Sequence, residues 1–371
     1  MWRRAINRQL HKLYDHGLGL YGFINSLVSP ILALSPLVLR IRITKNCNFH
    51  CSFCFQSESL NPKEKGHLEI SEWKKIIDKL PRRTILDVTG GEPFIAKNFI
   101  PLMTYFLDKG HKTSVMTNGS IYNEELLNLF VDKKLYYLMF SVEDIGDAHD
   151  NMRSAPKSYE KIIRNLKAIQ DIKKKKNSKY PLIGIKTTVT DTNWKNLIDL
   201  HDECVRIGGI DHHSLNLLKQ NPVRGGNEIY DNENDPVFTA GNTAYYESSA
   251  RQLSQQILKL INHSKTTKLP ISFKPNIPLN QLESYFSNPG SFGVKACHKI
   301  NGIITMYYDG ALAPCDIGID IGNVRDFDYS LKKVWRAQKF KRYQKKLAAS
   351  FPYPKVCEGC CLATHTLNPS A

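Results

Sequence analysis

The sequence predicts an α/β fold with parallel strands, followed by a smaller cysteine-rich region. Strand-like and helix-like segments alternate about six times between residues 38 and 218. Such alternation is typical of parallel strands joined by right-handed crossovers, in an open barrel or a doubly wound sheet. A hairpin signal and a second group of cysteines follow only after residue 295. At roughly 100–200 residues per domain, the 371 residues allow two domains, or one large domain with an appendage.

The composition narrows the class of protein. Hydrophobic residues make up 42% of the chain and charged residues 23%, which excludes a mostly disordered chain, a collagen and a coiled coil. The formal net charge of +16 favours an anionic partner, such as a phosphorylated substrate, nucleic acid or a membrane surface, without choosing among them. Nine clustered cysteines indicate metal ligation in a reducing compartment rather than a disulfide scaffold. We therefore expect a cytoplasmic protein.

Residues 1–37 form a basic amphipathic and then apolar N-terminal segment. Residues 1–16 place apolar side chains at helical spacing with basic side chains between them, and residues 17–39 carry no formal charge. Pro30 and Pro36 interrupt this uncharged run, which weakens it as a membrane-spanning helix. We expect a helix and loop packed on the outside of the main domain. The alternative is a peripheral contact between residues 1–37 and the inner face of a membrane.

The region 38–220 is expected to form the main domain. Its first strand is the clearest, because Leu39, Ile41 and Ile43 alternate with Arg40 and Arg42. Further strands are expected at 84–89, 112–117, 135–142, 182–190 and 212–218, with helices at 71–80, 98–109, 123–132, 158–172 and 192–207. In folds of this kind, ligands gather at the carboxyl ends of the strands.

Residues 221–290 are expected to be a linker with one helix, and residues 291–371 a small α+β domain. The linker combines a polar loop at 219–244, an amphipathic helix at 245–263 and a loop-like, proline-rich stretch at 265–295. Asp309-Gly310 between apolar runs at 303–308 and 311–315 is a strong hairpin signal. A basic helix is expected at about 331–347.

The first cysteine cluster follows the first strand directly. Cys47, Cys51 and Cys54 are spaced C-x3-C-x2-C. Thiolates are soft ligands suited to zinc and to iron–sulfur clusters, and a working metal site keeps one coordination position open. Three thiolates therefore favour an iron–sulfur cluster with one free iron. The alternative is a zinc site with His50 as its fourth ligand.

The run C-N-F-H-C-S-F-C at residues 47–54 resembles the signature of the radical S-adenosylmethionine (SAM) superfamily, and the resemblance extends over roughly residues 38–218. It implies a partial (β/α)6 barrel and a 4Fe–4S cluster whose open iron is chelated by SAM. It also implies an electron donor such as flavodoxin or ferredoxin, whose electron cleaves SAM through the cluster. The resulting 5′-deoxyadenosyl radical would abstract a hydrogen atom from the substrate.

The resemblance also implies SAM-binding residues near the cysteines. Phe53 precedes the last cysteine, where an aromatic ring packs against adenine. In Gly90-Gly91-Glu92-Pro93, the glycines would let the backbone approach the ligand, and Glu92 would pair with the methionine ammonium group. Asn118 lies in a Thr-Asn-Gly turn after the third strand, which is also usual for the family.

Two further SAM contacts are implied after the fourth strand. Ser141 stands where the family often places a polar group against the ribose. Glu143 and Asp144 replace the commoner Asp-Gly of the family, so the assignment among these three residues stays open. Arg153 would present its guanidinium group to the SAM carboxylate.

The second cysteine cluster resembles the C-terminal "twitch" extension of radical SAM enzymes, a shortened SPASM domain. Its expected ligands are Cys297, Cys315, Cys357 and Cys360, with Cys361 as the alternative to Cys360. Because no cysteine follows Cys361, one auxiliary 4Fe–4S cluster fits better than two. A zinc ribbon is the alternative.

We therefore expect a radical SAM oxidoreductase or related radical enzyme. Only 46 residues precede Cys47, fewer than the peptide-recognition domain of many maturases needs, which favours a small-molecule substrate that is sugar-like, phosphorylated or lipid-linked. Maturation of a ribosomally made peptide is one alternative. RNA modification is another, which the sequence favours less, and it would show salt-sensitive RNA binding.

Overall fold

The computed structural model describes residues 36–54, 60–217, 249–275, 277–287, 298–315 and 320–349. The N-terminal helix predicted within residues 1–16 lies outside these ranges. Within them, no helix is both long and apolar enough to cross a membrane.

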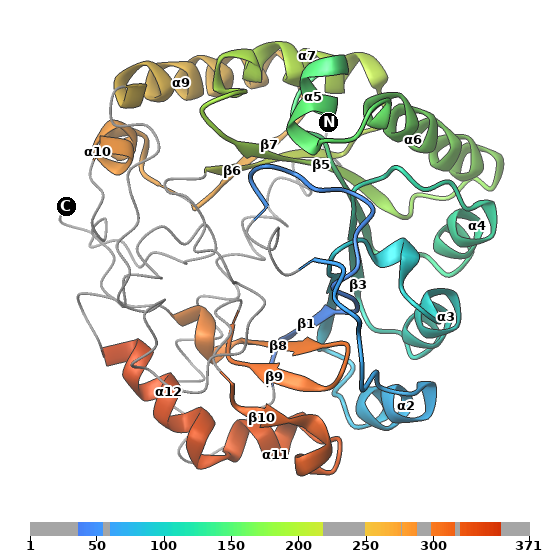
Figure 1. Cartoon of the computed structure of the whole chain (residues 1–371). Helices are drawn as coiled ribbons and strands as arrows, with labels where there is room; N and C mark the ends of the chain where they lie inside the picture. Colours follow the sequence, from blue (N-terminus) through green and yellow to red (C-terminus); the bar gives the residue numbers. More distant parts are fainter. Residues whose placement is uncertain are drawn as a thin grey trace.

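A single curved sheet runs through the molecule (Figure 1). Its ten strands follow the order β10-β9-β8-β1-β2-β3-β4-β5-β6-β7. Neighbours from β1 to β7 pair in parallel, β8 adds in parallel beside β1, and β9 and β10 are antiparallel. The strands are β1 (Val38–Arg42), β2 (Ile85–Thr89), β3 (Thr113–Thr117), β4 (Tyr137–Ser141), β5 (Leu182–Val189), β6 (His212–Leu217), β7 (Ile271–Lys274), β8 (Ile303–Tyr307), β9 (Ala311–Ala313) and β10 (Gly322–Asn323).

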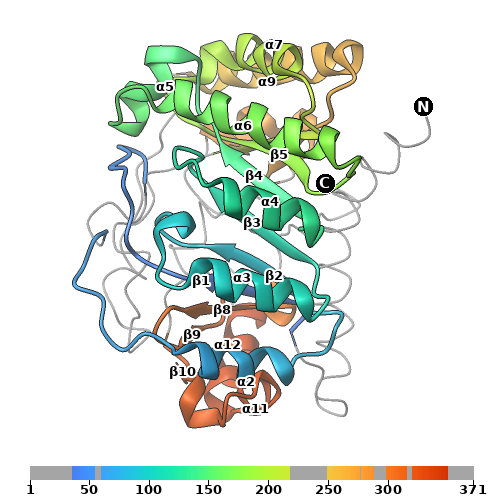
Figure 2. The same ribbon diagram turned by 90° about the vertical axis from the view of Figure 1, so that its right-hand side faces the viewer.

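Helices cover the outer side of this sheet, and Figure 2 shows α2, α3, α4 and α6 along it. The longer helices are α2 (Ile70–Asp78), α3 (Phe99–Asp108), α4 (Glu124–Asp132), α5 (Gly146–Arg153), α6 (Ser158–Lys175), α7 (Leu197–Ile207), α9 (Ala250–Thr267) and α12 (Gln338–Ala349), and the short ones are α10 (Leu282–Ser287) and α11 (Leu331–Arg336). Each amphipathic helix buries one apolar face; α3, for example, buries Phe99, Leu102, Met103 and Phe106. The strand–helix alternation predicted from the sequence is confirmed.

The strands have two different faces. On β1, Leu39 and Ile41 lie in the apolar cluster beneath the helices, so Arg40 and Arg42 point to the opposite, inner face. The same alternation appears on β4, where Phe140 is buried beneath the helices and Met139 is half-buried. On these two strands the outward positions are apolar and buried, whereas the inward Arg40 and Met139 are half-buried.

Two sequence predictions need correction, and the structure adds one helix. The stretch 265–295 contains the seventh parallel strand, β7, and helix α10, where a loop was expected. The helix expected at 331–347 is two helices, which meet at Ala337 in an extended conformation (ψ 139°). Residues 146–153 form the helix α5, which the sequence analysis did not assign.

The predicted hairpin at Asp309-Gly310 is confirmed as β8 and β9. It does not stand apart from the main domain, because β8 pairs with β1 from Val38↔Ile303 to Arg42↔Tyr307.

Candidate functional site

The three cysteines of the first cluster lie on the loop that leaves the carboxyl end of β1. Cys51 is 6% exposed, and Cys47 and Cys54 are half-buried. The loop turns back on itself, because the backbone N–H of Cys54 donates to the carbonyl of Cys51 at 3.1 Å. The backbone N–H of Phe49 lies 3.4 Å from the Cys47 Sγ. The predicted ligand set therefore shares one compact turn.

A carboxylate that sequence reasoning missed holds the start of this loop. Glu64 accepts hydrogen bonds from the Thr44 hydroxyl (2.9 Å), the Lys45 backbone N–H (2.5 Å) and the Asn46 side-chain amide (3.1 Å). Its side chain is only 6% exposed. The one available signal was its position, ten residues after Cys54, and that distance suggests nothing without the fold.

Asn61 is a second missed residue in the same segment. Its Oδ1 accepts a hydrogen bond from the backbone N–H of Cys47 at 2.8 Å. Its Nδ2 lies 3.4 Å from the Nε2 of His50, whose side chain is exposed. His50 therefore contacts Asn61 across the loop.

Gly90 and Gly91 allow the end of β2 to pack against the cysteine loop. The backbone N–H of Gly91 donates to the Thr44 carbonyl, and that of Glu92 donates to the Asn46 carbonyl, both at 2.8 Å. A Cβ on Gly91 would lie 2.1 Å from the Asn46 carbonyl oxygen, and one on Gly90 would lie 2.5 Å from the Thr44 carbonyl oxygen. These glycines thus permit a close approach to the loop backbone, and their predicted approach to the ligand stays a prediction.

Glu92 joins the ends of two strands. Its buried carboxylate accepts hydrogen bonds from the Thr117 hydroxyl (2.7 Å), the Asn118 backbone N–H (2.7 Å) and the Phe94 backbone N–H (3.0 Å). Burial raises its pKa above the ordinary value, although these hydrogen bonds oppose the shift. The Asn118 side-chain amide also donates to Asn48 Oδ1 at 2.8 Å, which links β3 to the cysteine loop.

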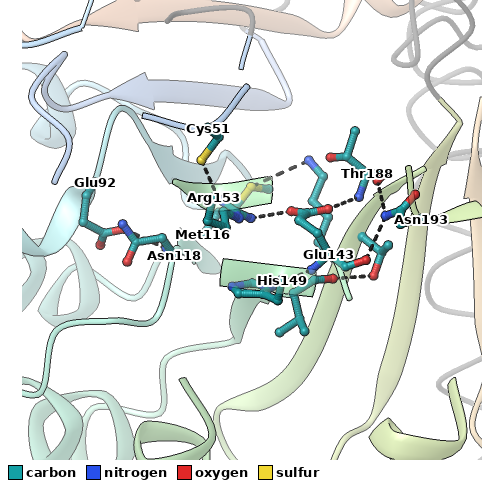
Figure 3. A network of polar contacts seen from close by, with 12 residues as sticks. Cys51, Glu92, Met116, Asn118, Glu143, His149, Arg153, Thr188 and Asn193 are labelled. Atoms are coloured by element: carbon teal, nitrogen blue, oxygen red, sulfur yellow. Dashed lines mark hydrogen bonds and ion pairs between the residues drawn. The ribbon is translucent and has the colours of Figure 1, made fainter. Parts of the chain in front are cut away.

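Arg153 lies at the end of α5, between a thiol and a carboxylate (Figure 3). Its guanidinium group contacts Cys51 Sγ at 3.5 Å and forms an ion pair with Glu143. The ring of Phe53 lies 5.4 Å from the guanidinium carbon. Arg153 is 7% exposed. Its contacts bring together the predicted site residues Cys51, which is buried, and Phe53, which is half-buried.

The three polar residues at the end of β4 and directly after it differ in their contacts. Glu143 accepts from the Thr188 backbone N–H as well as from Arg153 (Figure 3). Asp144 accepts from the Asn196 side chain at 2.9 Å. Ser141 is half-buried at the end of β4. Of the three, Glu143 is the residue tied directly to the cysteine loop through Arg153.

Burial disfavours the ionised form of two of the three thiols. Burial is the largest influence on Cys47 and raises its pKa to about 11. Burial also raises the pKa of Cys51, although the charge of Arg153 opposes it. Metal binding releases such protons because the thiolate is the ligand.

Across the described ranges, no three His, Cys, Asp or Glu side chains are grouped closely enough to hold one metal ion. The fit of the loop to an iron–sulfur cluster therefore rests on the chemistry of its side chains. Three thiols can act as ligands, and the Arg153 guanidinium beside Cys51 favours the thiolate form.

Of the second cluster, only Cys315 lies within the part of the chain that the structure describes. It is half-buried shortly after β9. Cys297, Cys357, Cys360 and Cys361 lie outside the described residues, so the choice between Cys360 and Cys361 stays a prediction.

Two family models match the chain. Residues 41–200 match the radical SAM superfamily, and residues 297–361 match SPASM, an iron–sulfur cluster-binding domain. Among known proteins, the AdoMet-dependent heme synthase of Nitratidesulfovibrio vulgaris (strain Hildenborough) is 25% identical over 340 residues, which cover 88% of this chain and 87% of that protein. The antilisterial bacteriocin subtilosin biosynthesis protein AlbA of Bacillus subtilis (strain 168) is 23% identical over 344 residues, with 88% and 67% covered.

Solved structures are similar in fold. Native anSMEcpe with bound AdoMet has a TM-score of 0.61 at 16% identity, and the match covers 84% of this chain and 84% of that chain. Streptococcus suis SuiB has a TM-score of 0.61 at 16% identity, with 84% of this chain and 68% of that chain covered. These likenesses confirm the predicted fold.

Proposed function

We propose that this chain, which belongs to the radical SAM superfamily and carries a SPASM domain, abstracts a hydrogen atom from a small molecule and so oxidises or rearranges it. One observation carries the proposal: the loop that bears the three cysteines hydrogen-bonds to the residues after β2 and β3, and Arg153 connects it to Glu143 after β4. With a 4Fe–4S cluster and SAM bound there, reductive cleavage of SAM supplies a 5′-deoxyadenosyl radical, the chemistry for which the family is known.

The cysteines, Glu64 and Arg153 would have different roles in holding the cluster. Cys47, Cys51 and Cys54 would ligate the SAM-cleaving cluster. Glu64 holds the backbone from which the cysteine loop starts, through the contacts described above. Arg153 places a positive charge beside the Cys51 sulfur, which stabilises the thiolate form that ligation requires.

The SAM contacts are proposed from the same geometry. Phe53 lies on the cysteine loop, and Asn118 and Arg153 contact that loop. Glu92 follows β2, and Ser141 is the last residue of β4. The Arg153 guanidinium already pairs with Glu143, which orients it. A guanidinium group presents five N–H donors, so the pair with Glu143 leaves donors for the SAM carboxylate.

The substrate class is proposed from the relatives. The heme synthases of Nitratidesulfovibrio vulgaris and Methanosarcina barkeri match 88% of this chain, and a heme synthase acts on a small molecule. The match to AlbA, a bacteriocin biosynthesis protein, over 88% of the chain favours peptide maturation as the second candidate. A reductant is needed in either case, and we propose a flavodoxin or ferredoxin.

Iron analysis tests the proposal most directly. After anaerobic reconstitution, we expect about eight irons per chain, and about four in the Cys47/Cys51/Cys54→Ala triple variant, as two four-iron clusters require. The wild type should form 5′-deoxyadenosine from SAM with dithionite, and the triple variant should not. The matched control is Cys204→Ala, because Cys204 is a buried cysteine on α7, away from the loop. Zinc in place of iron in the wild type would overturn the proposal.

A further inference from the structure

A line of polar side chains crosses the apolar outer layer. It runs from Thr267 on α9 through His201 on α7 and His213 on β6 to Thr187 on β5. His201, His213 and Thr187 are fully buried. Buried polar groups cost free energy unless they are hydrogen-bonded, and the proposed function uses none of these residues. This polar chain therefore needs an explanation of its own.

The inner end of the polar chain sets the direction of its hydrogen bonds. The Thr187 hydroxyl donates to the carbonyl of Val142 at 2.6 Å, because a carbonyl can only accept. The hydroxyl oxygen then accepts from Nε2 of His213, 3.0 Å away. Burial lowers the pKa of both histidines, so each ring carries one proton. His213 Nδ1 thus accepts from His201 Nδ1 at 3.3 Å, and His201 Nε2 accepts from the Thr267 hydroxyl at 2.8 Å. Because the chain ends on a carbonyl, which cannot pass a proton on, it suits holding a peptide group.

The peptide group that Thr187 holds leads directly into Glu143. On its other side, the backbone N–H of Glu143 donates to Nδ1 of the buried His149 at 3.1 Å. The next peptide group is held by Asn193, whose Nδ2 donates to the Glu143 carbonyl at 2.8 Å and to the Thr188 carbonyl at 2.9 Å (Figure 3). Asn193 is 1% exposed. Side chains therefore fix the backbone on both sides of Glu143.

The carboxylate of Glu143 carries this order toward the cysteine loop. It accepts from the Thr188 backbone N–H and pairs with Arg153, whose guanidinium lies 3.5 Å from Cys51 Sγ. A carboxylate that is fixed in place favours one position of its guanidinium partner, because such pairs are directional. The contacts of Thr187 and Asn193 thus reach the cysteine loop through Glu143 and Arg153 in turn.

We propose that Thr187 and Asn193 are positioning residues. They fix the backbone of Glu143, so that its carboxylate holds Arg153 beside Cys51 and in place for the SAM carboxylate. This inference rests on the proposed function, in which Arg153 meets the SAM carboxylate. It adds two residues to the site, one on β5 and one in the segment between β5 and α7.

Equilibrium binding of SAM to the reconstituted enzyme, measured by anaerobic calorimetry, tests this inference. Thr187→Val removes the hydroxyl and keeps the shape of the side chain. We expect it to weaken SAM binding about fivefold, as for the loss of one neutral hydrogen bond. Thr187→Ser keeps the hydroxyl and should restore most of the affinity.

Thr113→Val is the matched control. The Thr113 hydroxyl is also buried and donates to a carbonyl, that of His111 at 3.1 Å, but it lies at the start of β3 and not at the carboxyl end. This variant should bind SAM as tightly as the wild type. A loss equal to that of Thr187→Val would overturn the inference, as would unchanged SAM binding in Thr187→Val.

A double-mutant cycle separates positioning from a general loss of stability. Glu143→Gln removes the charge that holds Arg153 and should weaken SAM binding about tenfold. Because Thr187 acts through Glu143, Thr187→Val should cause no further loss of SAM affinity in the Glu143→Gln background. The same fivefold loss in both backgrounds would refute the positioning role.

Asn193→Ala is the second variant for the same cycle, since it removes both donors that hold the Glu143 and Thr188 carbonyls. It should show the same loss and the same absence of a further loss with Glu143→Gln, and it replaces Thr187→Val if that variant holds less iron. Iron content and 5′-deoxyadenosine formation in the wild type report on the proposed function separately. A wild type that passes both tests, together with unchanged SAM binding in the variants, would refute this inference alone.

Discussion

Two regions of this protein are built in opposite ways. In the outer layer, strands and helices pack through periodic apolar side chains such as Leu138, Phe140 and Leu166, all at most 1% exposed. At the carboxyl ends of β1 to β4, short hydrogen bonds join loops that are distant in the sequence, as between Asn118 and Asn48. The outer layer therefore distributes its stability over many contacts, whereas the site depends on a few polar contacts with strict geometry.

This difference predicts different responses to substitution. A change in the outer layer should lower the free energy of unfolding and leave the ligand geometry intact until the protein unfolds. A change of one atom in the site should disturb cofactor binding at nearly unchanged stability. Three predictions test this contrast.

The largest effect is expected for Gly91→Ala. Its new Cβ would lie 2.1 Å from the Asn46 carbonyl oxygen, which is backbone and cannot move aside without shifting the cysteine loop. We expect the reconstituted variant to hold about four irons in place of about eight, with its far-ultraviolet circular dichroism unchanged.

Gly110→Ala is the control for this variant. A Cβ on Gly110 would meet no atom within 4 Å, so only its positive φ of +76° makes the substitution costly, by about 1 kcal/mol. It should keep the full iron content. Full iron content in Gly91→Ala would refute the role of this glycine.

The second prediction compares the two faces of β4. Phe140→Ala should lower the free energy of unfolding by about 3–5 kcal/mol, because the ring is 1% exposed in the outer cluster. Met139→Ala on the inner face should lower it by about 1 kcal/mol, since Met139 is only half-buried. Anaerobic urea unfolding measures both, and equal losses would contradict the contrast between the faces.

The smallest effect concerns a pair of histidines buried in the outer layer. His201 of α7 and His213 of β6 have stacked rings with centroids 5.6 Å apart, and both are fully buried. Burial, as the largest cause, lowers the pKa of His201 to about 4 and that of His213 to about 3. Both are therefore neutral in the folded protein near pH 7, whereas an unfolded histidine has a pKa of about 6.5.

The sign of the pH effect follows from these values. The unfolded chain takes up protons first as the pH falls below about 6.5, so stability is complete above that pH and is lost as the pH falls toward about 4. Between pH 7.5 and 5.5 we expect a loss of about 1–3 kcal/mol, seen as a lower thermal midpoint. His201→Gln should show a smaller loss over the same interval. An identical loss in this variant would mean that other groups set the pH dependence.

The sequence alone determined the features that local spacing encodes. The three cysteines fall within eight residues, so they can be proposed as a ligand set without the fold. Leu39, Ile41 and Ile43 mark their strand by simple alternation. Asp309-Gly310 fixed its hairpin in the same way. Each of these signals lies within a few residues and needs no distant partner.

Only the tertiary structure decided which distant residues meet. Glu64 and Asn61 hold the cysteine loop, and Arg153 lies between Cys51 and Glu143, because the ends of parallel strands converge at one edge of the sheet. Strand β7 alternates apolar and polar residues over only four positions, which is too short for a strong signal, so its pairing with β6 defines it. Local spacing thus predicted the chemistry, while long-range packing set the geometry in which that chemistry is held.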